Sequence, residues 1–308
     1  MNPKPILIIS AIIEMHSYQK ISIVTVCLNS VSTIEDTIRS VISQNYPNLE
    51  YIIIDGGSND GTIDIIRRYE QHLAYWISEK DEGFGFALQK GFARSTGEIM
   101  AYINADDMYH PGAFHNVATI FRLFPKVQWL MGFPTLFNKE GVTFCQILLP
   151  WTRWSRHRFY NNDLMAIQQE STFWKRELWE QSGASIDLQY KLAVDIHLWF
   201  KFFRHEQLYT TTIPLAGFRY NSPEQISIGK RKEYLEECGR MLKEERAEMS
   251  IIALINTKLR WLVAQPFKLF FGFNFPWLTA VYCQILQLPD LIFYDFKENQ
   301  FVMRKQLK

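Results

Sequence analysis

Short apolar runs alternate with amphipathic stretches over residues 21–104. The runs are rich in β-branched residues and nearly continuous, as expected of strands buried on both faces, whereas the intervening stretches repeat apolar residues at helical spacing. This β-α-β-α-β-α-β order predicts a parallel, doubly wound sheet with helices on both faces. The predicted strands are 21–28, 49–55, 74–78 and 98–104, and the predicted helices are 32–44, 63–72 and 85–96.

Two local signals mark the boundaries of the predicted helix 32–44. Ser32 stands three residues before Glu35, which predicts a capping box at the start of this helix. The sequence Tyr46-Pro47-Asn48 predicts its end, because proline cannot continue a helix.

Beyond Pro111 the pattern is less regular. It predicts a hairpin of 127–137 and 141–149, helices at 171–183, 192–205 and 230–253, and a strand at 209–221. We divide the chain into an N-terminal extension (1–20), a first half (21–110), a second half (111–229) and a C-terminal helical region (230–308).

Acidic residues gather where the predicted strands end. In a doubly wound sheet the ligand crevice lies off the carboxyl ends of the strands, so the loops that follow them converge in space. Three of the four loops carry carboxylates, and this is the strongest functional signal in the pattern. The strand ends are 27–29, 55–58, 79–83 and 104–107.

Each of these carboxylates has two possible roles. Asp106 and Asp107 either cap a helix beginning near Pro111 or hold a divalent cation, because Mg²⁺ and Mn²⁺ take oxygen ligands from carboxylates and phosphates. Asp55 either forms an Asx-turn or accepts from a nucleotide base. Asp81 is either part of a solvated loop or part of the same site.

Composition narrows the class of protein. Apolar residues make up 47% of the 308-residue chain, which excludes a disordered protein, and a net charge of +1 gives no reason to expect nucleic acid as a partner. The four cysteines form no C-x-x-C pair, so we expect a reducing, cytoplasmic compartment. The apolar stretch at 5–13 lacks the basic start and cleavage site of a signal peptide, and we do not expect one.

Several motifs occur in an order that resembles the family 2 glycosyltransferases, which have the GT-A fold. "YIIIDGGSNDGT" is similar to that family's D-G-x-S-x-D-G-T signature. "SEKDEGFGFALQKGFARSTGEIMAYINADD" resembles its acidic-Gly loop, its A-x-x-K-G helix and its metal-binding acidic pair. "QQESTFWKRELWEQSG", "LAVDIHLWFKFFRH" and "GFRYNSPEQIS" are similar to later segments of bacterial members that build polysaccharides, so the resemblance covers about 21–228.

The resemblance implies inverting transfer of a sugar from a nucleotide diphosphate sugar, with UDP as the expected nucleotide, to a glycan or lipid-linked acceptor, with Mn²⁺ or Mg²⁺ as cofactor. It implies that Asp55 contacts the base, Asp106 the ribose or sugar, and Asp107 the metal, and that Asp195 is the base which activates the acceptor. The other residues that it assigns to the nucleotide or donor are Thr25, Cys27, Asn29, Gly57, Ser58, Asp81, Lys90, Gln169 and Glu170.

The chain departs from the family pattern at three positions and leaves two other functions open. Phe86, Gln89 and His197 differ from the residues common in the family, which puts the donor sugar in doubt more than the reaction. A sugar nucleotidyltransferase would need a Gly-rich first loop with Arg or Lys, and "VCLNSVSTIED" has neither. A binding protein that has lost catalysis is disfavoured by the retained acidic residues.

The C-terminal region suggests contact with a membrane surface. Residues 251–289 contain three cations, Lys258, Arg260 and Lys268, and no acidic residue, among many aromatic and aliphatic side chains. Such a segment suits attachment to an anionic leaflet, and we expect a cytoplasmic protein that is peripheral on the inner face of the membrane. A buried packing surface, an oligomer contact or a true span at 269–288 are the alternatives.

Overall fold

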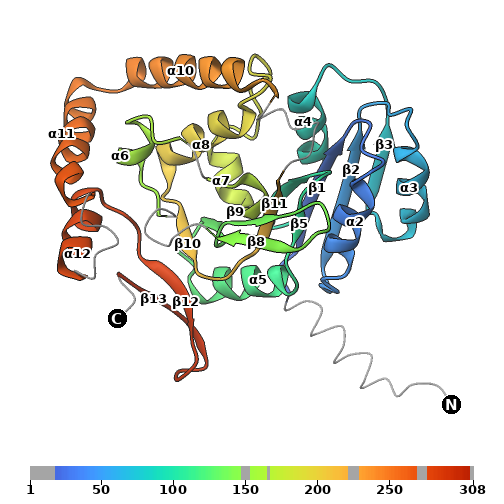
Figure 1. Cartoon of the computed structure of the whole chain (residues 1–308), viewed down its shortest axis with the longest axis horizontal. Coiled ribbons are helices and arrows are strands. Elements are labelled where there is room, and N and C mark those ends of the chain that lie inside the picture. The colour runs from blue at the N-terminus through green and yellow to red at the C-terminus, as the bar shows by residue number, and fades with distance from the viewer. Residues whose placement is uncertain (1–17, 147–152, 165–166, 221–228, 269–275, 306–308) are drawn as a thin grey trace.

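The computed structural model describes residues 18–146, 153–164, 167–220, 229–268 and 276–305. Its centre is a nine-stranded sheet in the order β13-β12-β10-β6-β9-β4-β1-β2-β3 (Figure 1). The four N-terminal strands are parallel and alternate with helices, so the predicted doubly wound arrangement is confirmed. These elements are β1 (Ile21–Cys27), α2 (Ile34–Ile42), β2 (Leu49–Asp55), α3 (Thr62–Arg68), β3 (Tyr75–Ser78), α4 (Phe84–Arg94) and β4 (Ile99–Asn104).

The predicted capping box at the start of α2 is wrong. The helix begins at Ile34 after Thr33, which makes no side-chain cap hydrogen bond. The Glu35 carboxylate instead accepts from the Tyr69 hydroxyl at 2.7 Å and pairs with Arg68 of α3 at 3.1 Å. Glu35 therefore joins two helices, and this contact takes the place of the local cap.

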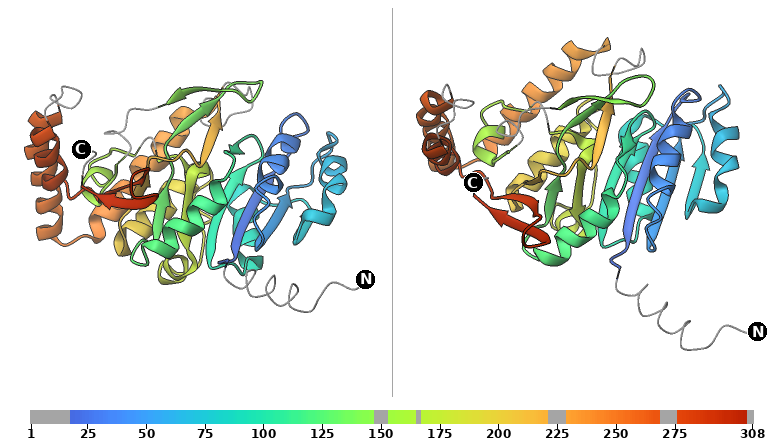
Figure 2. Two further views of the ribbon diagram at one scale, coloured as in Figure 1. Left: turned by 90° about the horizontal axis from the view of Figure 1, so that it is seen from below. Right: turned by 60° about the horizontal axis from the view of Figure 1, so that its bottom comes forward.

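A second, four-stranded sheet in the order β5-β11-β7-β8 stands off from the large one (Figure 2). The hairpin of β7 and β8 is confirmed. The predicted strand 127–137 is divided into β6 in the large sheet and β7 in the small one, and the predicted strand 209–221 is divided in the same way into β10 and β11. Pro134 and Pro214 lie between these pairs, and proline interrupts a ladder because it has no N–H to donate. The elements are β5 (Met108–Tyr109), α5 (Ala113–Leu123), β6 (Trp129–Met131), β7 (Thr135–Phe137), β8 (Thr143–Gln146), β10 (Tyr209–Thr211) and β11 (Ala216–Arg219).

The helix predicted at 171–183 is in fact a strand followed by a short helix. β9 (Thr172–Lys175) inserts antiparallel between β4 and β6, and α7 (Arg176–Gln181) follows it. Phe173 and Trp174 are both fully buried, one on each face of the sheet, so pairing on two edges overrides the helical spacing of the apolar residues.

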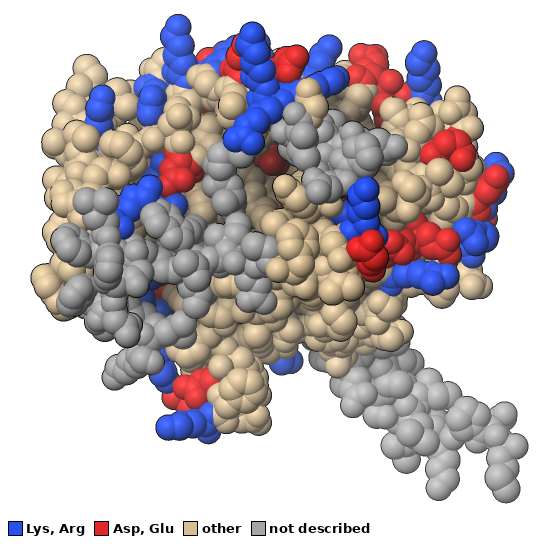
Figure 3. Space-filling view, viewed as in Figure 1, with Lys and Arg blue, Asp and Glu red and all other residues tan. Residues whose placement is uncertain are grey.

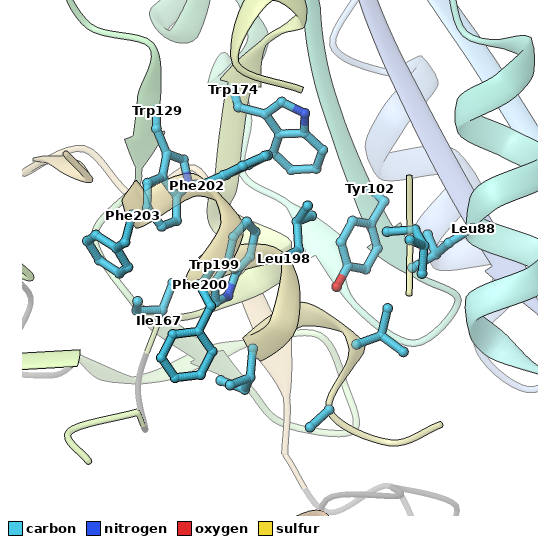
Figure 4. Packing of buried hydrophobic residues seen from close by; sticks show 14 of the residues in the cluster. Leu88, Tyr102, Trp129, Ile167, Trp174, Leu198, Trp199, Phe200, Phe202 and Phe203 are labelled. Atoms are coloured by element: carbon cyan, nitrogen blue, oxygen red, sulfur yellow. The ribbon is translucent and has the colours of Figure 1, made fainter. Parts of the chain in front are cut away.

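Aromatic side chains form the core beneath helix α8 (Val194–His205). Trp129 of β6 lies 5.2 Å from Trp199 and 5.3 Å from Phe202 between ring centroids, and Trp174 lies 5.5 Å from Phe202 (Figure 4). The remaining short helix of this half is α6 (Arg156–Phe159). This packing fixes α8 against the sheet, and with it the residues at the N-terminus of that helix.

The C-terminal region is helical only in part. Helices α10 (Arg231–Glu248), α11 (Ile251–Lys268) and α12 (Pro276–Ile285) lie on the side of the molecule away from β3 (Figure 1). They are followed by β12 (Leu291–Asp295) and β13 (Gln300–Arg304), a hairpin at the edge of the large sheet that was not predicted. Within the described residues, no helix is both long and apolar enough to cross a membrane. Most of the predicted N-terminal extension and part of 269–288 lie outside the described residues.

Candidate active site

The carboxyl ends of four neighbouring strands lie level with one another at one edge of the large sheet. Val26 of β1 is paired with Asn104 of β4, Cys27 with Asp55 of β2, and Asp55 with Ser78 of β3. The loops after these strands therefore begin side by side. Acidic atoms are visible in a hollow near the upper centre of the face drawn in Figure 3.

Asp55 organises the loop that follows β2. Its side chain is fully buried, and one carboxylate oxygen accepts from the backbone N–H groups of Gly57 and Ser58, at 3.0 and 2.9 Å, and from the Ser78 hydroxyl at 2.6 Å. The other oxygen accepts from the Ser58 hydroxyl at 2.5 Å and the Cys27 thiol at 3.4 Å. This is the Asx-turn expected as one of its two roles, and contact of Asp55 with a base remains a prediction.

Replacing Asp55 with Asn should destabilise the protein strongly. The amide would place an N–H₂ group against N–H and hydroxyl donors, leaving buried donors unpaired. We expect the free energy of unfolding to fall by roughly 2–4 kcal/mol, measured by urea denaturation. Asp64→Asn is the control, because the Asp64 side chain is 81% exposed. An Asp55→Asn protein as stable as the control would contradict this role.

The first two loops are tied to each other. The Asn29 backbone N–H donates to the Ser58 hydroxyl at 2.7 Å, and the Asn59 N–H donates to the Asn29 side chain at 3.0 Å. Asn29 has a positive φ of 51°, and Gly57 has one of 87°. Both residues adopt a left-handed conformation that Asn and Gly tolerate well. The two hydrogen bonds join the loop after β1 to the loop after β2.

Three other residues that were predicted to bind the donor, Asp81, Lys90 and Thr25, lie in different surroundings. The Asp81 carboxylate accepts from the Gly83 N–H at 2.9 Å, and a side chain at Gly56 would come within 3.2 Å of it. Lys90 of α4 pairs with Glu79. Thr25 is fully buried inside the sheet, where its hydroxyl bonds that of Tyr51 at 3.0 Å. Thr25 thus lies in the core of the sheet.

The acidic pair after β4 has one half-buried and one fully buried member. Asp107 is fully buried; one of its carboxylate oxygens accepts from the Arg219 backbone N–H at 3.0 Å, and the other lies 3.4 Å from the Asn104 amide. Asp106 is partly exposed. Helix α5 begins after Gly112 without any side-chain cap, so the alternative that this pair caps a helix is wrong.

Two further carboxylates from the second half approach this pair. Glu170 lies in a 3₁₀ turn (Gln169–Ser171) before β9, and Asp195 lies in the first turn of α8. Burial raises the pKa of Glu170 to about 8, with help from the charges of Asp106 and Asp195, and burial raises the pKa of Asp195 to about 6. Burial, Asp106 and Glu170 likewise hold the pKa of Asp107 well above its usual range. The four groups thus form one electrostatic cluster.

Several polar atoms at this cluster have no hydrogen-bond partner within the described part of the chain. They are one carboxylate oxygen of Glu170, the side-chain oxygen of Asn104, and both amide atoms of Gln169. Glu170 is 2% exposed. Buried polar atoms are normally paired, so an oxygen-rich cluster of this kind is typical of a site that a ligand completes.

Asp195 is held in place from two sides. On one side, α8 packs on the aromatic core. On the other, the Glu237 carboxylate of α10 accepts from the backbone N–H groups of Leu192 and Ala193, at 2.9 and 3.0 Å. These donors lie at the N-terminus of α8, where a helix leaves N–H groups unpaired. Helix α10 therefore fixes the start of α8 and the position of Asp195.

Sequence reasoning missed three residues of this site. Ser78 ends β3 and bonds Asp55, so its position at a strand end could have identified it. Asn104 ends β4 and could have been found in the same way. Arg219 lies within the family-like segment "GFRYNSPEQIS", but its role at the site was not identified, because its contacts with the acidic pair span more than one hundred positions, 112 to Asp107 and 113 to Asp106.

Comparison with known proteins identifies related glycosyltransferases. Residues 22–169 match the model of glycosyl transferase family 2. An uncharacterized glycosyltransferase of Rickettsia prowazekii is 25% identical over 75% of this chain and 74% of its own length. The putative teichuronic acid biosynthesis glycosyltransferase TuaG of Bacillus subtilis is 36% identical over 29% of this chain and 36% of its own length.

Solved structures show the same fold at low sequence identity. S. aureus TarS 1–349, in complex with UDP-GlcNAc, superposes with a TM-score of 0.63 at 13% identity and covers 87% of this chain and 81% of its own. The parallel N-terminal half, the family model and the related glycosyltransferases agree. Residues 22–169 therefore form a glycosyl transferase family 2 domain, and the protein is a glycosyltransferase with a GT-A fold.

Proposed function

We propose that this protein transfers a sugar from a UDP-linked donor to a glycan or lipid-linked acceptor during synthesis of a surface polysaccharide. The observation that carries the proposal is the electrostatic cluster formed by Asp106, Asp107, Glu170 and Asp195. The name of TuaG supports the polysaccharide, and the UDP-GlcNAc bound by TarS supports the donor class. Asp81, Lys90 and Gln169 keep their predicted roles beside the donor.

The acidic pair fits a divalent cation. Partly exposed Asp106, buried Asp107 and the unpartnered oxygens of Asn104 and Glu170 offer the hard oxygen atoms that Mg²⁺ and Mn²⁺ bind. No group of three acidic, histidine or cysteine residues within the described ranges is arranged to enclose a metal. This suits an ion held by one or two carboxylates and completed by diphosphate and water. When bound, the cation neutralises the charge that develops on the leaving diphosphate.

Asp195 is the proposed base that activates the acceptor. Its raised pKa of about 6 lets it ionise at neutral pH and still attract the proton of an acceptor hydroxyl. The hydroxyl oxygen attacks the anomeric carbon as the bond to the diphosphate breaks, and the proton passes to the Asp195 carboxylate. Attack from the face opposite the leaving group inverts the anomeric carbon.

Product release tests this function. The protein is incubated with UDP-GlcNAc, MnCl₂ and a panel of saccharide and lipid-linked acceptors, and free UDP is measured. Acceptor-stimulated release supports transfer, whereas tight donor binding without release would favour a binding protein that has lost catalysis. Formation of a nucleotide sugar from UTP and a sugar phosphate would favour a nucleotidyltransferase.

Helix α11 supports peripheral attachment to the inner face of the membrane. Its outward residues Ile251, Ile252, Ile255, Leu259, Leu262 and Val263 are between 48% and 82% exposed. Lys258 flanks this apolar face, and the surface over α11 at the left edge of Figure 3 is mostly uncharged. Apolar residues beside cations suit an anionic leaflet. The three cysteines whose side chains are described are free thiols, which suits the cytoplasm.

Replacing Ile255 and Leu259 together with Glu should release the protein from anionic membranes. Two charges on the apolar face oppose insertion and repel anionic headgroups. We expect co-sedimentation with phosphatidylglycerol vesicles to be largely lost, whereas Leu235→Glu on α10, at a residue that is 46% exposed, leaves it unchanged. Equal sedimentation of all three proteins would exclude α11 as the attachment surface.

A further inference from the structure

Arg219 lies at the carboxyl end of β11, and its side chain is only 5% exposed. The guanidinium spreads three donors over three separate elements. Nε donates to the backbone carbonyl of Asp106 at 2.7 Å, Nη1 to the carbonyl of Lys139 at 3.0 Å, and Nη2 to the Asp36 carboxylate at 2.9 Å. One side chain thus joins the acidic loop, the β7–β8 turn and helix α2.

The backbone around Arg219 holds the second member of the acidic pair. The Arg219 N–H donates to the Asp107 carboxylate at 3.0 Å, and the Thr37 hydroxyl of α2 donates to the Asp107 carbonyl at 2.8 Å. Both backbone carbonyls of the pair and one of its carboxylates are therefore fixed. Arg219 is involved in two of these three contacts.

The chemistry of the side chain suits this position. A guanidinium keeps its charge and presents five donors in a rigid plane, whereas the lysine ammonium is a flexible point charge that cannot reach three divergent acceptors at once. The Asp36 side chain is 53% exposed, so that ion pair contributes little by itself. The partly buried bonds to the carbonyls of Asp106 and Lys139 carry the geometric constraint.

We propose that Arg219 is a positioning residue that sets the geometry of Asp106 and Asp107 for the cation and diphosphate. This role rests on the proposed function, because it assumes that the pair holds the cation. Arg219 reaches the pair from β11 in the second half of the chain and also contacts α2 in the first. It therefore couples the acceptor side of the molecule to the nucleotide side through the loop that both share.

Calorimetric titration of UDP into Arg219→Gln and Arg219→Lys, in MnCl₂ and in excess EDTA, tests the proposal. In MnCl₂ we expect UDP to bind Arg219→Gln about tenfold or more weakly than wild type, since charge-assisted bonds to the loop are lost. The UDP affinity of Arg219→Lys should lie between those of Arg219→Gln and wild type. In EDTA the three proteins should bind UDP alike, because the loop then holds no cation. Arg304→Gln, which removes a partly exposed ion pair on β13, should match wild type throughout.

The outcomes separate positioning from a merely structural role. A folded Arg219→Gln protein with wild-type UDP affinity in MnCl₂ would overturn the proposal, even if its melting temperature fell. Where Arg219→Gln does not fold, Arg219→Lys decides by the same comparison. Wild-type affinity that is equal in MnCl₂ and EDTA would instead remove the proposed cation, and the role of Arg219 with it.

Discussion

Replacing Asp195 with Asn lowers the rate of sugar transfer by roughly 10²–10⁴-fold while UDP still binds, because this is the usual contribution of a positioned general base. The amide has nearly the same shape as the carboxylate, so the packing of α8 on Trp129 and Trp174 should be retained. Acceptor-dependent release of UDP measures the rate, and calorimetry measures UDP affinity. Glu177→Gln, an exposed change in the first turn of the neighbouring helix α7, should leave both unchanged.

The pH dependence of transfer tests the same residue. Asp195 must be ionised to accept a proton, and its pKa is about 6, so the wild-type rate should fall about tenfold per pH unit below 6. The titratable groups whose charges interact with Asp195 are Tyr102 of β4, Glu170 before β9, and Tyr234 and Cys238 of α10. The residual rate of Asp195→Asn should lack this acid limb; undiminished turnover would exclude Asp195 as the base.

Replacing Asp107 with Ala should reduce cation-dependent transfer to the background level. The change removes a carboxylate of the proposed cation site and the acceptor for the Arg219 N–H, so the diphosphate loses the charge that stabilises its departure. We expect a loss of about a thousandfold or more in UDP release, together with loss of the difference between MnCl₂ and EDTA.

Asp64→Ala provides the control for this change. The matching substitution Asp106→Ala shows which member of the acidic pair binds the cation directly. Asp106 is partly exposed and Asp107 is buried, so a larger effect on Mn²⁺ affinity from Asp106→Ala would assign the direct ligand to Asp106 and the support to Asp107. Full transfer by Asp107→Ala in the presence of chelator would contradict the metal assignment for both residues.

The first half of the fold was predictable because its signals are local. Each strand from β1 to β4 is an apolar run of its own, and helices with the helical period lie between these strands, so the β-α-β alternation predicted that the strands run parallel. Asp55 and the acidic pair were found because they end such strands. Asn104 and Ser78 also lie at the ends of these strands.

The second half depends on contacts between distant segments. The apolar residues of 171–183 are spaced as in a helix. Phe173 and Trp174 nevertheless lie in a strand, because β4 and β6 provide two edges for this strand to pair with. Glu35, expected to cap its own helix, bonds Tyr69 instead. Arg219 bonds Asp107, and Glu237 bonds the start of α8, across long stretches of chain, so the local sequence around each residue does not reveal its partner.

The central claim is that the strand-end carboxylates form a cation-assisted site for a uridine diphosphate sugar. Calorimetric titration of UDP into the wild-type protein, in MnCl₂ and then in excess EDTA, with GDP as the competing nucleotide, tests it most directly. We expect UDP to bind in MnCl₂ in preference to GDP, and EDTA to weaken this binding strongly. Equal UDP affinity in MnCl₂ and EDTA, or a preference for GDP, would contradict it.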